Sequence, residues 1–251
     1  QSSFDIQTGA SLQFDNSTLE WQGQLSKSGA GELTLDEVRL TGNASYLGSS
    51  QASLRLLQLN DHRLELESET SSLKFSVPLI LSGSESELKS NQANLIFEKG
   101  LKLSAGKLSS TGGRVEVRDN LTSTGGTLDF QNSTMAMGGT WNQQGGTLLS
   151  SGNTLQLLGI LNLESSNELN FQELDLAGNT LIFGEGTSTK LKILSAFSID
   201  AGTEGIQVDN GSLTMQESLT MNAGTRDLRA RFLGFSVVIP RDLRQHCCRL
   251  M

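Results

Sequence analysis

The sequence repeats a short phrase in which two apolar residues flank one residue that is usually polar. The phrase returns about once every 20 residues, as in Leu12-Gln-Phe14, Leu33-Thr-Leu35 and Leu73-Lys-Phe75. This spacing of two is the side-chain period of a β-strand with one buried face and one solvated face. Since such a short strand is not stable alone, each copy must bury its apolar residues against the neighbouring copies.

We predict that these apolar residues form one internal ladder, in which each residue stacks on its equivalent in the previous coil. If the strands pair in parallel, successive copies lie about 4.8 Å apart. A degenerate copy, Leu148-Leu-Ser150, falls inside the series. The predicted ladder consists of Leu12, Phe14, Leu33, Leu35, Leu54, Leu56, Leu73, Phe75, Leu95, Phe97, Val115, Val117, Leu128, Phe130, Leu169, Phe171, Leu191, Ile193, Ile206 and Val208.

The sequence between successive copies of the phrase indicates how many strands each repeat contains. Residues 11–31 and 169–188 each hold two further apolar patches, and each ends in a Gly- and Ser-containing corner. Three short strands per repeat predict an all-β fold, a single-stranded parallel β-helix with three sides and about 10 coils of roughly 20 residues. Right-handed winding is expected from the general crossover preference. We assign residues 1–225 to this domain and residues 226–251 to a separate tail.

One step in the series is too short for a full coil. Val115 and Leu128 are only 13 residues apart. Either one of the two phrases matches by chance, or a side of the coil is dropped near 118–123. We favour the chance match.

Composition and charge narrow the function classes. The 251 residues include 27 Gly and 2 Pro and carry a net charge of −8. An acidic chain without a basic face disfavours nucleic acid as a partner, because no concentrated cationic surface could release the counterions of the phosphates. No apolar run is long enough to form a membrane-spanning helix. Both cysteines lie in the last five residues. A long cysteine-free stretch is common in exported proteins and compatible with cytosolic ones.

The most diagnostic corners are Gly-Gly-Thr-Leu at 125–128 and 145–148, and the strand starts Asn153-Thr-Leu155 and Asn179-Thr-Leu181. Paired glycines permit the positive φ of a sharp corner. In these motifs the chain resembles the passenger and stalk regions of bacterial autotransporter and filamentous-haemagglutinin-type adhesins, over roughly residues 9–224. The resemblance implies an extracellular or cell-surface location, with host or environmental glycans or cell-surface molecules as partners. No basic and apolar signal segment is present, so the export signal is expected to lie outside this chain.

The tail differs in composition, since six of the 11 arginines lie in residues 226–251. It could be a cap over the open end of the solenoid. It could also be an out-of-frame extension, or a functional basic or thiol-reactive tail. The vicinal pair Cys247-Cys248 matches neither a redox motif nor a zinc-ligand spacing.

Only a few residues are candidates for a functional role. Trp21 is expected to fill the core, with a sugar-stacking platform as the alternative. Asn60-Asp-His-Arg63 is expected to form a corner, and His62 has no second histidine nearby. Glu65, Glu67 and Glu69 alternate and predict a solvated acidic face, with a cation site as the weaker alternative. Five Asn-x-Ser/Thr sequons occur, at Asn16, Asn43, Asn120, Asn132 and Asn210.

Enzyme activity is the competing class, because many parallel β-helices are polysaccharide lyases or glycoside hydrolases. The chain contains none of the Asn-Thr-Asp, Asp-Asp, Gly-His-Gly or Arg-Ile-Lys motifs by which such enzymes resemble one another. One histidine in the first 245 residues argues against Ser-His-Asp catalysis. An ice-binding face would require Thr-x-Thr in register on successive coils, and the isolated threonines of this chain do not supply that pattern.

We therefore expect no catalytic residue, no cofactor and no metal ligand. We predict a structural or adhesive segment of a large exported bacterial surface protein, acting as a rigid spacer or ligand-presenting stalk. The alternatives are a β-helix polysaccharide lyase or glycoside hydrolase, and a filament module whose coil ends associate end to end.

Overall fold

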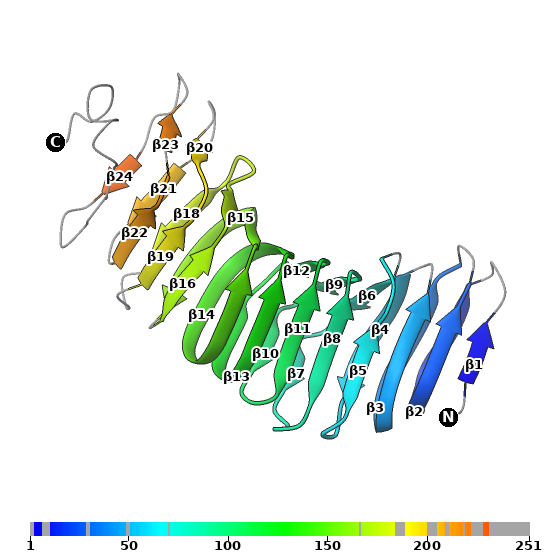
Figure 1. The fold of residues 1–251 in the computed structure, drawn as a ribbon. Helices are drawn as coiled ribbons and strands as arrows, with labels where there is room; N and C mark the ends of the chain where they lie inside the picture. Colours follow the sequence, from blue (N-terminus) through cyan, green and yellow to red (C-terminus); the bar gives the residue numbers. More distant parts are fainter. Residues whose placement is uncertain are drawn as a thin grey trace.

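The computed structural model shows a stack of coils built only from β-strands among the residues that it describes (Figure 1). It describes residues 3–6, 11–28, 31–48, 51–69, 71–165, 167–183, 189–199, 205–208, 211–217, 219–221 and 228–230. All 22 described strand pairings are parallel, and each joins strands of successive coils. The predicted parallel β-helix is therefore confirmed, with about nine turns.

Each coil passes through three faces, which we name A, B and C in chain order. The long strands turn corners, where their pairing register shifts, and contribute to more than one face. Face A comprises the first parts of β2 (Leu12–Lys27), β3 (Leu33–Gly48), β4 (Gln51–Gln58), β14 (Thr134–Ser151) and β15 (Thr154–Ser165), with β6 (Ser72–Phe75), β9 (Asn94–Phe97), β12 (Arg114–Val117), β17 (Glu173–Asp175), β20 (Phe197–Ile199) and β23 (Leu219–Met221).

Faces B and C take up the remaining strands. Face B comprises later parts of β2, β3, β4, β14 and β15, the first part of β13 (Leu121–Gln131), and β7 (Leu79–Leu81), β10 (Leu101–Leu103), β18 (Thr180–Phe183), β21 (Gly205–Val208) and β24 (Leu228–Ala230). Face C comprises β1 (Ser3–Ile6), the ends of β2, β3, β13 and β14, and β5 (Arg63–Leu66), β8 (Glu87–Asn91), β11 (Lys107–Thr111), β16 (Glu168–Phe171), β19 (Thr189–Ile193) and β22 (Gly211–Met215).

The core is an apolar ladder on each face, because side chains alternate between the interior and solvent along every strand. On face A, Leu95 pairs with Leu73 on one side and Val115 on the other. On face C, Leu108 lies between Leu88 and Leu128 in the same way. Stacking of equivalent residues thus supplies the core that a single coil lacks.

The single ladder that the sequence predicts is in fact three ladders. The phrases beginning at Leu128, Leu169 and Leu191 lie on face C, and the phrase beginning at Ile206 lies on face B. The apolar-x-apolar pattern recurs on every face, so the repeat alone does not show which face a given copy occupies. The 13-residue step has the same explanation: Val115 lies on face A and Leu128 on face C of one coil. Both are buried, so the preferred explanation of a chance match is wrong.

The predicted position of the phrase Leu54-Arg-Leu56 in the ladder is also wrong, by two residues along the strand. Leu54 pairs with Leu35 and occupies the second inward position, while Ala52 occupies the first. Leu56 lies opposite Glu37 and is half-buried. The run contains several overlapping apolar-x-apolar frames, and pairing with Phe75 in the following coil selects the frame that ends at Leu54.

The remaining predicted ladder residues are less buried in the first coil than in the coils that follow it. Most are almost completely buried, but Phe14 in the first coil is 37% exposed and Leu12 is half-buried. The backbone of Val208 pairs with Phe183, while its side chain lies outside the described part.

The corners confirm the role of the glycine pairs. Gly126 and Gly146 adopt φ values of 70° and 75°. A Cβ on Gly126 would also lie 2.7 Å from the carbonyl oxygen of Gly106, so the corner backbones of adjacent coils are in close contact. The strand pairing then places Leu128 on Leu148.

Asn60 and Asp61, with φ values of 50° and 60°, form the predicted corner before Arg63. In the predicted tail, β24 pairs with β21. Residues 231–251, including Cys247 and Cys248, lie outside the described residues.

Candidate functional site

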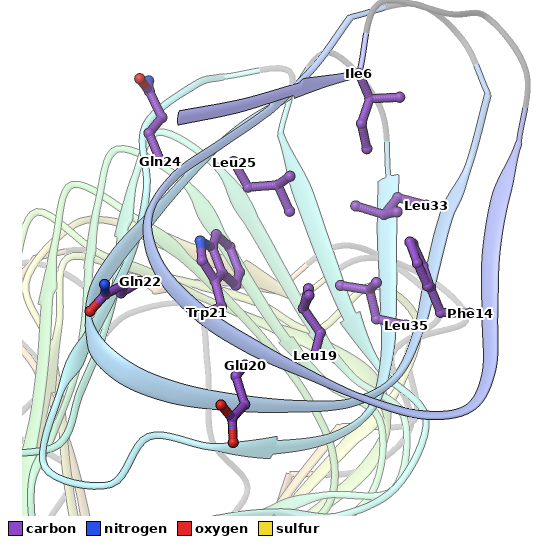
Figure 2. Close-up of a pocket in the computed structure, with 10 residues that line it drawn as sticks. All are labelled: Ile6, Phe14, Leu19, Glu20, Trp21, Gln22, Gln24, Leu25, Leu33 and Leu35. Atoms are coloured by element: carbon purple, nitrogen blue, oxygen red, sulfur yellow. The ribbon is translucent and has the colours of Figure 1, made fainter. Parts of the chain in front are cut away.

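An apolar cavity of about 380 Å³ lies in the interior at the N-terminal end of the solenoid (Figure 2). Figure 2 shows Trp21, Leu19 and Leu25 of the first coil pointing toward the same interior space as Leu33 and Leu35 of the second. Ile6 of β1 and Phe14 of β2 also line it. The polar lining residues are Glu20, Gln22 and Gln24, which are exposed to solvent.

Among the described residues, the first coil has a preceding strand on face C only. On face C, residues Gln24–Lys27 pair with β1, which precedes them. On faces A and B, the described residues provide no strand before Leu12–Phe14 or before Thr18–Trp21. Leu12 and Leu19 are consequently half-buried, whereas their partners Leu33 and Val38 in the next coil are 1% and 0% exposed.

Trp21 forms part of the cavity wall and is 7% exposed. Its indole Nε1 donates a hydrogen bond to the carbonyl oxygen of Gly23 at 3.1 Å. The indole is thus held inside the coil, which confirms the core interpretation and excludes an exposed stacking platform. Because the inward lining is apolar, the cavity suits apolar side chains rather than acid–base chemistry.

Outside the coils, charged side chains form networks that bridge neighbouring coils. Glu65 on face C accepts hydrogen bonds from Lys89 Nζ at 2.7 Å and from Asn91 Nδ2 at 2.6 Å. Partial burial alone would raise the pKa of Glu65, but these bonds and the charges of Lys89 and Arg63 outweigh it, so the pKa is lowered. Glu65 is therefore held as a carboxylate by protein partners.

The predicted acidic face of Glu65, Glu67 and Glu69 is only partly formed. The strand ends at Leu66, and the backbone N–H of Glu67 donates to the carbonyl of Tyr46. Glu67 and Glu69 are exposed, as expected for a solvated face. Nowhere in the described part of the chain do three or more His, Cys, Asp or Glu residues group closely enough to hold a metal ion.

A second network joins three coils on face A. Glu98 contacts Lys74 Nζ at 2.9 Å and Arg118 Nη1 at 3.3 Å. Arg118 Nε also donates to Glu116 at 2.6 Å, and Arg114 Nε lies 3.3 Å from the same carboxylate. Burial tends to raise the pKa of Glu116, but the two guanidinium groups lower it overall. The pairs of Glu98 connect three successive coils, and the pairs of Glu116 keep its carboxylate ionised within one coil.

Buried polar residues line one corner of the interior. Asn153 is fully buried, its Oδ1 accepts from the N–H of Ser133 at 3.0 Å, and its Nδ2 donates to the carbonyl of Phe130 at 2.8 Å. Ser133 Oγ donates to the carbonyl of Ser110 at 3.1 Å. These side chains hydrogen-bond to backbone atoms at and beside the corner between faces C and A, which is a structural role.

Two features of the site were not identified from the sequence. Prediction of the cavity requires knowledge of how β1 and the first two coils pack, and the apolar pattern of residues 12–25 resembles that of the other coils. The ion pairs leave a weak signal, since opposite charges recur 20 to 24 residues apart, as in Glu98–Arg118 and Glu65–Lys89. The spacing varies with corner length, so the pairs cannot be assigned without the register.

Searches against family models, curated proteins and solved structures found no match for this chain. The described residues also include no helix with the length and apolarity needed to cross a bilayer.

Proposed function

We propose that this chain is a rigid spacer or presenting segment of a large exported bacterial surface protein of the adhesin type. The observation that supports this proposal most directly is the continuity of the inner ladders. On face A, an unbroken series of pairings runs from Leu12 to Leu174. A stack of this kind resists bending because any bend must separate packed side chains.

The dimensions suit a spacer. Parallel strands are separated by about 4.8 Å, so about nine turns give a rod about 40 Å long. The outer networks around Glu65, Glu98 and Glu116 connect successive coils and oppose sliding of one coil over another. Each exposed ion pair contributes little by itself, about 0–1 kcal/mol, but the pairs are distributed along the rod.

Ligand presentation would use the outer faces, which carry short polar side chains between the ion pairs. Binding of host or environmental glycans to such shallow surfaces is expected to be weak for each site. Display of many copies on a cell surface would raise the overall avidity.

The stiffness is tested by distance measurements along face A. Thr34 and Gln156 face outward on this face, six pairing steps apart. Spin labels at these two positions, in a chain with Cys247→Ser and Cys248→Ser, are expected to give one narrow distance distribution near about 29 Å. A broad distribution, or a much shorter distance, would contradict the spacer proposal.

The adhesive role is tested separately, by binding of an immobilised multivalent form to a glycan panel. The same preparation should release neither reducing ends nor unsaturated sugars from polyuronides and other polysaccharides. Release of such products would favour the lyase or hydrolase alternative instead.

A further inference from the structure

The sheet of face C is interrupted in the middle of the described stack. Residues 147–151, at the end of β14, pair with residues 127–131 of the preceding coil but with no described strand of the following coil. β16 lies on face C of that following coil, pairs with β19 and begins a separate sheet. We call the unpaired boundary between residues 147–151 and β16 the seam. Faces A and B remain paired at the same level, through β14 and β15.

The seam has its cause in the length of the chain on face C. Pairing aligns Gln143 with Ser165 before this face and Thr154 with Glu173 after it. The path from Gln143 to Thr154 is 11 residues long, as in the coil before it, but the path from Ser165 to Glu173 is only 8 residues long. Since three extended residues span about 10 Å, the shorter path cannot follow the longer one. β16 therefore takes a more direct course than residues 147–151.

Burial shows the same offset between the two coils. Leu148 points inward from β14 and is half-buried, whereas its partner Leu128 in the preceding coil is fully buried. The outward Leu149 is 50% exposed, whereas its partner Asp129 is 9% exposed. The strand of residues 147–151 is thus less covered than the strand that precedes it.

Side-chain contacts, rather than backbone pairing, join the two coils at the seam. Ser150 Oγ donates a hydrogen bond to the carbonyl oxygen of Asn170. Trp141 and Phe171 pack edge to face, with ring centroids 5.9 Å apart. Trp141 is fully buried, yet its indole Nε1 has no hydrogen-bond partner in the described part of the molecule. Burial of an unpaired donor is unfavourable, and an opening that admits water would relieve it.

The corner between faces A and B, which lies opposite face C, is loose at the same level. Leu158, Gly159 and Ile160 form this corner, where the preceding coil has the single residue Gly138 between its paired segments. Leu158 and Ile160 are 39% and 53% exposed, and a Cβ on Gly159 would meet no atom within 4 Å. Bending about this corner therefore disturbs few packed side chains.

We propose that the seam is a hinge, at which the coils from β15 onward rotate about the corner between faces A and B while face C opens. A short path on face C, an unpaired strand edge and a loose corner all occur at this level, and Figure 1 shows the stack changing direction there. The inference goes beyond the spacer proposal, because it gives the rod one defined point of bending.

The test measures the width of distance distributions on face C. Arg63 and Lys190 are exposed, face outward and lie six coil steps apart, with the seam as one of the steps. Spin labels at these positions, in a chain with Cys247→Ser and Cys248→Ser, are expected to give a broad distribution. Thr34 and Gln156, six steps apart on face A, are the matched control and should give a narrow one.

The two pairs separate the hinge from the spacer proposal. Equal widths for the two pairs, whether narrow or broad, would overturn the hinge. The spacer proposal fails only if the face A pair itself gives a broad distribution.

A second variant tests the cause of the opening. Replacement of residues 166–167 by Gln-Gly-Gly and of Gln172 by Ser-Gly-Asn copies the two face C corners of the preceding coil and restores the three residues. This variant should let β16 pair with residues 147–151, so the distribution for Arg63 and Lys190 should narrow to that of the face A pair. Circular dichroism checks that the variant retains the sheet spectrum. A folded variant whose face C distribution stays broad would overturn the inference, because the width would then not arise at the seam.

Discussion

Phe75 and Phe97 stack face to face in adjacent coils, with ring centroids 5.0 Å apart and ring planes only 5° from parallel. The two residues lie 22 positions apart in the sequence and occupy the same inward position of face A. Each is at most 1% exposed. Their contact illustrates how this protein builds a core, since each coil supplies one layer and stability comes from contacts between layers.

Phe97→Asp is expected to unfold several adjacent coils. Truncation of a buried Phe to Ala already costs about 3–5 kcal/mol, and a carboxylate in a dry stack adds an unpaired charge. The change should appear as loss of the β-sheet circular dichroism signal and a lower melting temperature. Ile80→Asp is the matched control, because Ile80 points outward and is 58% exposed. An unchanged melt for Phe97→Asp would show that the described register is wrong.

Gly126→Ala is expected to destabilise the corner between faces B and C. Gly126 has a φ of 70°, and an added Cβ would lie 2.7 Å from the backbone oxygen of Gly106. Backbone strain of this kind costs about 1–3 kcal/mol. Gly159→Ala provides the control, since a Cβ there meets no atom within 4 Å. Urea unfolding of the two variants should differ clearly, and equal midpoints would contradict the corner geometry.

Asn153→Ala is expected to destabilise the protein through loss of two internal hydrogen bonds. The backbone N–H of Ser133 and the carbonyl of Phe130 would lose their side-chain partner inside the coil. Each buried polar group left unsatisfied costs about 1–3 kcal/mol. Asn162→Ala, on the outer side of face B, should have little effect. Hydrogen exchange at Ser133 gives the local readout, and unchanged protection there would count against the proposed role.

Glu116 should make the stability pH-dependent in the acid range. Although burial opposes ionisation, Arg118 and Arg114 lower the pKa of Glu116 below its ordinary value of 4.5. A group whose pKa is lowered by folding stabilises the protein above its unfolded-state pKa and loses that contribution as the pH falls through the folded-state pKa. The stability difference between wild type and Glu116→Gln should therefore be largest near neutral pH and shrink below about pH 4.5.

Chemical unfolding of both proteins across the acid range measures this difference. A magnitude of about 1 kcal/mol or less is expected, because Arg118 is largely exposed. Glu168→Gln, at an exposed position of face C, controls for the general effect of removing a negative charge. A difference that grows toward low pH would contradict the assignment.

The architecture could be predicted from the sequence because the apolar-x-apolar phrase has the period of a strand and recurs at the length of a coil. The corner glycines were also recognisable, since Gly126 and Gly146 occupy equivalent places in two identical Gly-Gly-Thr-Leu motifs. Assignment of Leu128 and Leu191 to the face A ladder failed because the same phrase serves all three faces. The N-terminal cavity was not predictable because it depends on how β1 and the first two coils pack together rather than on unusual residues.

The sequence by itself determined the local period, the length of the repeat and the corners where glycine is required, since these follow from side-chain alternation and backbone sterics within one coil. Only the tertiary structure decided which copy of the phrase stacks on which, as with Leu54 on Leu35 in place of Leu56. Register between coils depends on contacts between residues about 20 positions apart, and several frames satisfy the local pattern equally well. The packing of the whole stack selects one of them, because only that frame buries every layer at once.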